Sequence, residues 1–151
     1  MNKTNKIKVA LIFLAILCAF GCNKTKKQGF CTKTARISSE NIYIVEDNLN
    51  ILKSKKIAKI YIEQAFAYLL QNSSGNTFYT DILEKKDKYS VQLFSKKDGE
   101  KDVVFLNFFI LDYKSDDFYT KRVVVWDGGS YFWHISYDVQ KDEFFDVWIN
   151  Y

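Results

Sequence analysis

The side chains best suited to acid–base or nucleophilic chemistry lie near the end of the chain, at His134, Ser136 and Asp138. In an extended strand all three would share one face. Neighbours on a strand face are about 6.6 Å apart, because each residue advances the chain by about 3.3 Å. That spacing is too wide for the hydrogen bonds of a catalytic triad. The sequence therefore disfavours a triad hydrolase.

Metal and cofactor sites are also disfavoured. His134 is the only histidine in the 151 residues, which excludes zinc sites built from several histidines. Asp112, Asp116 and Asp117 resemble the start of a calcium loop, but Asp117 stands where that loop needs glycine and Val123 where it needs glutamate. We expect no cofactor, no metal and no enzymatic activity.

The first 21 residues have the composition of an export signal. Lys3, Lys6 and Lys8 precede an apolar run at 9–21. As a helix this run would be roughly 20 Å long, whereas a membrane span needs about 20 apolar residues. A basic start, a short apolar segment and small residues at its end are typical of a cleaved signal peptide.

The end of this run, Ala19-Phe20-Gly21-Cys22, resembles the lipobox of bacterial lipoproteins. The resemblance implies that residues 1–21 are removed, that Cys22 carries a diacylglyceryl group, and that the protein is lipid-anchored to a membrane of the bacterial cell envelope. It does not specify which membrane. An ordinary secretory signal or an uncleaved anchor are the alternatives.

Charge is distributed unevenly along the remaining chain. The whole sequence has 22 basic and 18 acidic residues, and loss of the three signal lysines leaves 19 basic. Residues 23–60 contain 9 basic and 3 acidic side chains, whereas 61–151 contain 10 and 15. We predict a basic tether at 22–40, either drawn to anionic lipids or simply solvated. The acidic distal part disfavours nucleic acid as a partner.

Residues 41–151 are expected to form a single α+β domain. Apolar periodicity predicts an amphipathic helix over 54–71, with Ser54 as its N-cap. Alternating patterns separated by short turns predict strands at 88–94, 103–113, 119–126, 130–139 and 143–151. The predicted fold is one N-terminal helix packed on a curved antiparallel meander sheet of four to five strands.

Aromatic residues are too numerous for one buried sheet face. Fifteen lie between residues 102 and 151, more than one helix can cover. We predict a second, aromatic face that serves as a candidate binding surface. Alternatively, these residues act only as strand formers, and the far face curls on itself or is covered by residues 42–45. The candidate binding residues are Trp126, Phe132, His134, Phe144 and Trp148.

The order of one helix and several antiparallel strands is similar to small cystatin-like or nuclear transport factor 2-like α+β domains of bacterial immunity proteins and envelope lipoproteins. The residues that carry this resemblance are the run GGSYFWHI at 128–135, the turn KDE at 141–143 and the closing strand at 144–149. The resemblance implies a non-catalytic module that occupies a partner protein, such as a toxin.

Two functions from different classes follow. The first is a lipid-anchored domain that binds a protein through its aromatic sheet face, as an immunity protein or an assembly factor would. The second is a sheet curled into a cone that holds a small apolar ligand or an active site, with Asp138, Asp146 or His134 as its polar groups. The sequence leaves both open.

Overall fold

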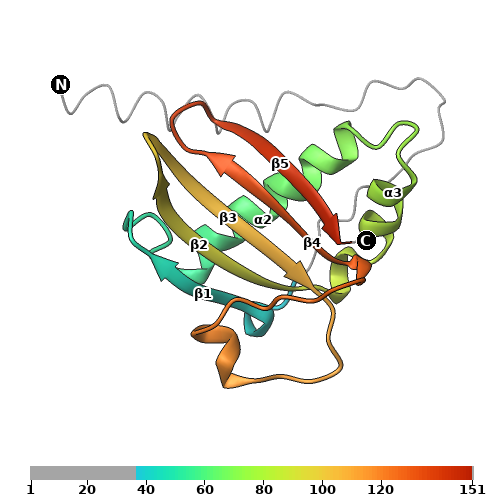
Figure 1. Ribbon diagram of the computed structural model, residues 1–151, viewed down its shortest axis with the longest axis horizontal. Coiled ribbons are helices and arrows are strands. Elements are labelled where there is room, and N and C mark those ends of the chain that lie inside the picture. The colour runs from blue at the N-terminus through green and yellow to red at the C-terminus, as the bar shows by residue number, and fades with distance from the viewer. Residues whose placement is uncertain (1–36, 151) are drawn as a thin grey trace. The chain divides into compact units, whose positions relative to one another are not determined.

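A five-stranded mixed sheet in the order β1-β2-β3-β4-β5 is the centre of the structure (Figure 1). The computed structural model describes residues 37–150, so the predicted signal peptide, Cys22, most of the tether and Tyr151 lie outside the described residues. The neighbours from β2 to β5 are antiparallel, whereas β1 runs parallel to β2. The strands are β1 (Ile42–Asp47), β2 (Ser90–Asp98), β3 (Lys101–Phe109), β4 (Gly129–Asp138) and β5 (Glu143–Asn150).

Helix α2 (Lys55–Gln71) occupies the segment predicted to be helical. The hydroxyl of Ser54 accepts a hydrogen bond from the Ile57 N–H at 3.3 Å, which satisfies one of the unpaired donors at the helix start. A second helix, α3 (Thr77–Glu84), was not predicted and begins at Asn76, whose side chain caps it in the same way. Three short 3-10 turns complete the elements: η1 (Ser39–Asn41), η2 (Lys86–Lys88) and η3 (Asp116–Tyr119).

The main core lies between α2 and one face of the sheet. Phe66 of α2 contacts Phe108 and Trp133, with ring centroids 5.3 and 5.9 Å away. Phe108 and Trp133 are paired residues on β3 and β4, and their rings stack at 3.9 Å. Aromatic packing against α2 therefore covers this face of the sheet. A binding surface would have to lie on the other face.

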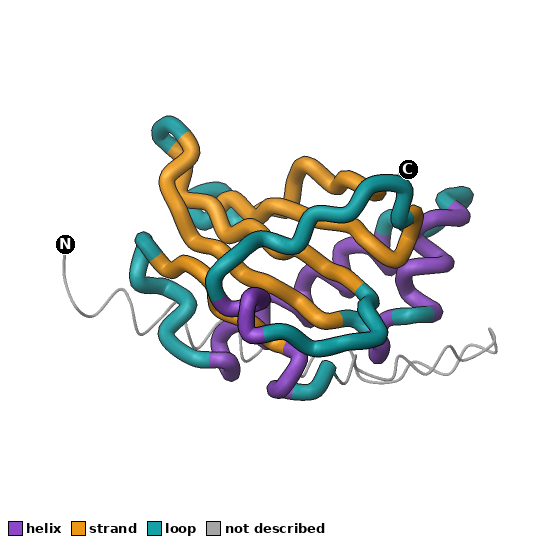
Figure 2. Tube along the Cα trace, turned by 60° about the horizontal axis from the view of Figure 1, so that its bottom comes forward, coloured by secondary structure: helices purple, strands orange, loops and turns teal. Residues whose placement is uncertain are grey.

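The long connection between β3 and β4, residues 110–128, lies on that other face; we call it the strap (Figure 2). The prediction of a strand at 119–126 is wrong, because this segment contains the end of η3 followed by chain that is not part of the sheet. Phe118 anchors the strap by packing edge-on against Tyr43 of β1 and Phe109 of β3, at 5.5 and 5.1 Å. The predicted strand at 103–113 accordingly ends at Phe109.

The fully buried side chain of Gln92 on β2 fastens the strap to the sheet. Its amide nitrogen donates to the carbonyl oxygens of Phe118 and Lys121, at 2.8 and 2.7 Å. Its amide oxygen accepts from the Val123 N–H at 2.8 Å and from the Asn107 side chain at 3.2 Å. Asn107 in turn donates to the Val123 carbonyl at 2.9 Å. Two side-chain amides thus supply the hydrogen bonds that a neighbouring strand would have made.

Replacing Gln92 with Ala should loosen the strap as well as destabilise the fold. The free energy of unfolding is expected to fall by about 2–4 kcal/mol, because several buried polar groups would lose their partners at about 1–3 kcal/mol each. Chemical denaturation measures the loss, and amide hydrogen exchange should show faster exchange at Val123 than in β3.

Gln140→Ala is the matched control. Gln140 is exposed and its side chain accepts one hydrogen bond, from the Asp102 N–H at 2.8 Å. Its removal should cost less than about 1 kcal/mol. Equal losses in the two variants would contradict the role assigned to Gln92.

Candidate functional site

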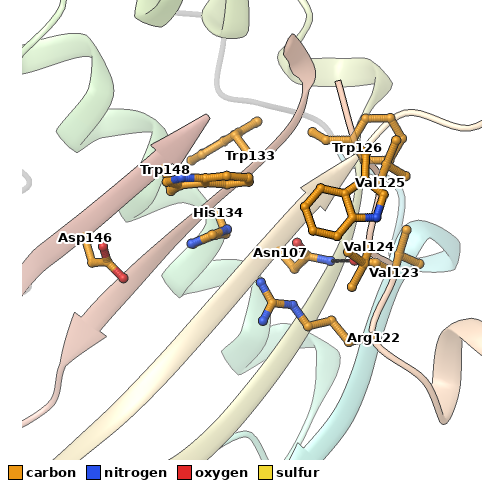
Figure 3. Close-up of a pocket in the computed structure, with 11 residues that line it drawn as sticks. Asn107, Arg122, Val123, Val124, Val125, Trp126, Trp133, His134, Asp146 and Trp148 are labelled. Atoms are coloured by element: carbon orange, nitrogen blue, oxygen red, sulfur yellow. Dashed lines mark hydrogen bonds between the residues drawn. The ribbon is translucent and has the colours of Figure 1, made fainter. Parts of the chain in front are cut away.

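An open pocket of about 420 Å³ lies between the strap and the sheet face formed by β4 and β5 (Figure 3). One wall of the pocket is formed by the sheet, which contributes Asn107 of β3, Phe132 and His134 of β4, and Asp146 and Trp148 of β5. The strap forms the opposite wall. The Gln92 and Asn107 hydrogen bonds therefore position one complete side of the pocket. The strap residues that line it are Arg122, Val123, Val124, Val125 and Trp126.

Two tryptophans line this pocket and leave much of their surface exposed to solvent. Trp126 is 84% exposed and Trp148 is 47% exposed. Val124, beside Trp126 on the strap, is 62% exposed. Figure 3 shows the two indoles on different sides of the pocket, one on the strap and one on β5. Large aromatic surface left in water at a concave site is typical of a binding surface.

His134 lies in the pocket between aromatic rings. It stacks on Trp148 with centroids 5.1 Å apart, and its other neighbour is Phe105 at 4.9 Å. Burial and then the nearby positive charge of Arg122 lower the pKa of His134 to about 4, against a smaller opposite effect of Asp146. His134 is therefore a neutral aromatic side chain at neutral pH.

Arg122 supplies a cation with no partner of opposite charge. Its guanidinium carbon lies 4.4 Å from the centroid of the Phe105 ring. Within residues 37–150 the guanidinium makes neither an ion pair nor a hydrogen bond. Partial burial lowers its pKa from the usual value, although an arginine stays charged under any ordinary condition. Figure 3 shows the guanidinium directed from the strap toward His134.

A β-bulge in β5 decides which side chains reach the pocket. His134 pairs with Trp148 and Ser136 pairs with Phe145, so two residues of β5 oppose Ile135. Asp146 lies in this bulge with a positive φ of 54°. The bulge brings Phe145 and Trp148 to the same side of the sheet, although a regular strand would place them on opposite sides.

The placement of Phe144 on the candidate binding face is therefore wrong. Phe144 packs on the helix side, with its ring 5.6 Å from Tyr68 of α2 and 5.0 Å from Tyr137. The strict alternation assumed for 143–151 fails at the bulge. The other four candidates, Trp126, Phe132, His134 and Trp148, all line the pocket.

Phe132 owes its position to a neighbouring glycine. A β-carbon at Gly128 would overlap the Phe132 ring, so the chain can pass over this ring only because residue 128 has no side chain.

The two carboxylates considered for the site are in different places. Asp146 lines the pocket. Asp138 is 2% exposed and accepts hydrogen bonds from the Gln140 and Lys141 N–H groups, both at 3.0 Å. Asp138 thus closes the turn between β4 and β5. It does not line the pocket that holds His134, and its hydrogen bonds go to the turn and not to His134 or Ser136.

Sequence reasoning missed Arg122 and Asn107. Arg122 is the only arginine between residues 37 and 150, and this was the available signal. Asn107 sits within an apolar strand pattern, VVFLNFF, where a lone amide indicates a buried hydrogen-bonding role. Neither residue could be placed in a pocket without knowing that the strap lies over the sheet.

The pocket brings together one arginine, one aspartate, a neutral histidine and aromatic surface. Within residues 37–150 no group of three or more potential ligand side chains could hold a metal ion. In the same part of the chain no helix is long and apolar enough to cross a membrane.

No protein-family model, curated protein or solved structure matches this chain.

The low pKa of His134 can be tested by titration. Its imidazole NMR signals should shift with a midpoint near pH 4 and not near 6.5. Arg122→Gln should raise the pKa, because a repelling charge is removed, but not to the ordinary value, because burial remains. Asp146→Asn should lower it further.

The folded pKa of His134 lies below its unfolded value, so the unfolded chain binds more protons between about pH 4 and 6.5. Its contribution to stability is thus lost as the pH falls through that range. Lys121→Gln is the control for Arg122→Gln: because Lys121 already pairs with Asp117 at 3.3 Å, its removal should change the pKa of His134 little. A midpoint near 6.5 in the wild type would contradict the assigned environment.

Proposed function

We propose that this protein is a non-catalytic binding domain whose pocket between the strap and β5 takes part of a partner protein. The exposure of Trp126 and Trp148 at the rim of a 420 Å³ pocket is the observation that carries the proposal. Tryptophan is enriched among the residues that contribute most to protein–protein affinity. An open pocket bordered by exposed aromatic rings suits a protein surface better than an enclosed apolar ligand.

The proposal includes the class of domain suggested by the sequence. The helix α2 followed by the antiparallel run from β2 to β5 supports a kinship with cystatin-like or nuclear transport factor 2-like immunity domains. The parallel β1 and the strap are additions to the meander expected from the sequence. An immunity-like or assembly role would use the pocket to occupy a partner.

We also propose that the domain works at a membrane of the bacterial cell envelope, held there by lipid on Cys22. The support is the sequence at 3–22: three lysines, an apolar run and small residues before a cysteine. Such an anchor would keep the pocket close to a membrane surface.

Site-specific photocrosslinking tests the binding proposal in cells that produce the full chain. A photoreactive amino acid at Val124, 62% exposed at the pocket, should give a discrete adduct. The same amino acid at Ile60, 50% exposed on α2, is the matched control and should not. The double variant Trp126→Ala, Trp148→Ala should reduce the Val124 adduct strongly, since loss of one such tryptophan costs about 2 kcal/mol or more.

Equal adducts from both positions, or an adduct insensitive to loss of both tryptophans, would contradict the proposal. Circular dichroism of the double variant checks that it remains folded. Neither tryptophan belongs to the buried core, so their removal should leave the core intact.

Lipid attachment is tested by detergent phase partitioning and by mass spectrometry of the peptide that contains residue 22. The wild-type chain should enter the detergent phase and carry a diacylglyceryl group, whereas Cys22→Ser should do neither. Cys31→Ser is the matched control and should behave as the wild type. Detergent partitioning of Cys22→Ser with an uncleaved leader would instead support a simple anchor.

A further inference from the structure

The strap presents unused hydrogen-bonding groups beside the pocket. The N–H and carbonyl of Val123 are taken by Gln92 and Asn107. The backbone groups of the next two residues, Val124 and Val125, have no hydrogen-bond partner within residues 37–150. A stretch of backbone with unpaired groups is the element to which extended peptides add as an extra strand.

The pocket beside this stretch has a charge that is not neutralised. The neighbouring exposed lysine, Lys121, is paired with Asp117, and Lys114 is paired with Glu40. Arg122 alone in this region faces the pocket without an acidic partner among the described residues. A guanidinium on aromatic surface, with its N–H groups free of acceptors, is suited to bind a carboxylate with two parallel hydrogen bonds.

Asp146 does not cancel this preference. It lines the same pocket but forms no ion pair with Arg122. Figure 3 shows the two side chains on different sides of His134. The pocket is therefore positive at its strap side and negative at its β5 side, which gives a bound segment a preferred direction.

We propose that the pocket binds an extended peptide segment of a protein partner, with an acidic side chain against Arg122 and an apolar or aromatic side chain against Trp126 and Trp148. The segment pairs its backbone with Val124, because adjacent residues of an extended chain direct their N–H and carbonyl groups to opposite sides and those of Val123 are taken by Gln92 and Asn107. This inference rests on the proposed function and adds to it the chemistry of the partner. The two parts are separable, because the tryptophans carry the first and Arg122 and the valine backbone carry the second.

The test uses the full chain in detergent and a random library of displayed heptapeptides as the probe. Peptides that bind the wild type more than the Trp126→Ala, Trp148→Ala variant should be enriched in Asp or Glu beside an apolar or aromatic residue. For the best peptide, Arg122→Gln should weaken binding by about tenfold or more, as expected for a hydrogen-bonded charge. Changing the peptide's acid to its amide should have the same effect, with little further loss when both changes are combined.

Lys121→Gln is the control and should change affinity less than about threefold, as a solvent-exposed charge does. On saturation with the peptide, the amide hydrogen of Val124 should become protected from exchange, whereas that of Val123, already bonded to Gln92, should change little.

Each result decides one part of the inference. Enriched peptides without an acid, or equal binding to Arg122→Gln, would overturn the acidic partner while leaving a tryptophan-based protein site intact. Unchanged exchange at Val124 would overturn strand pairing. If no peptide binds the wild type more tightly than the tryptophan variant, the result would count against both this inference and the proposed function.

Discussion

The hydrogen bonds of the Gln92 side-chain amide hold the strap on the sheet, and the pocket depends on them. A sheet has only two free edges, and here they belong to β1 and β5, so a chain that crosses from β3 to β4 over the sheet face finds no strand to pair with. Its backbone groups must then be satisfied by side chains or by water. Gln92 has two donors and an accepting oxygen, and all three bond to the strap or to Asn107. A carboxylate at this position would have no donor for the two strap carbonyls.

The second constraint is the extra residue in β5. Without the bulge, the face that carries Trp148 would continue through Asp146 to Phe144, and Phe145 would lie toward α2. With it, Phe144 joins Tyr68 and Tyr137 in the packing around the helix. Asp146 then occupies a left-handed conformation that aspartate tolerates better than most residues. A single local irregularity thus turns the Phe144 ring toward α2 and places Phe145 on the same side of the sheet as Trp148.

The sequence was informative where periodicity and caps decide structure. The α+β class, the helical segment at α2 with its Ser54 cap, and four strand segments follow from alternation and local hydrogen bonding. The strap was mistaken for a strand because Val123–Val125 have strong β-propensity, which measures local preference and not the availability of a neighbouring strand. The bulge and the parallel pairing of β1 depend on contacts between distant residues, and no local pattern shows them. Four of the five candidate face residues line the pocket, and the fifth was misplaced by the bulge.

The electrostatics of the pocket depend on keeping its cation accessible. A salt bridge with a carboxylate of its own chain would use the N–H groups of Arg122 before any ligand arrived. Contact with the Phe105 ring stabilises the charge without using those donors in hydrogen bonds. The neighbouring His134 stays neutral because it is buried against aromatic rings, so it adds no second positive charge that would repel Arg122. A cation supported by aromatic surface can bind a carboxylate without first breaking an existing ion pair, and this lowers the cost of recognition.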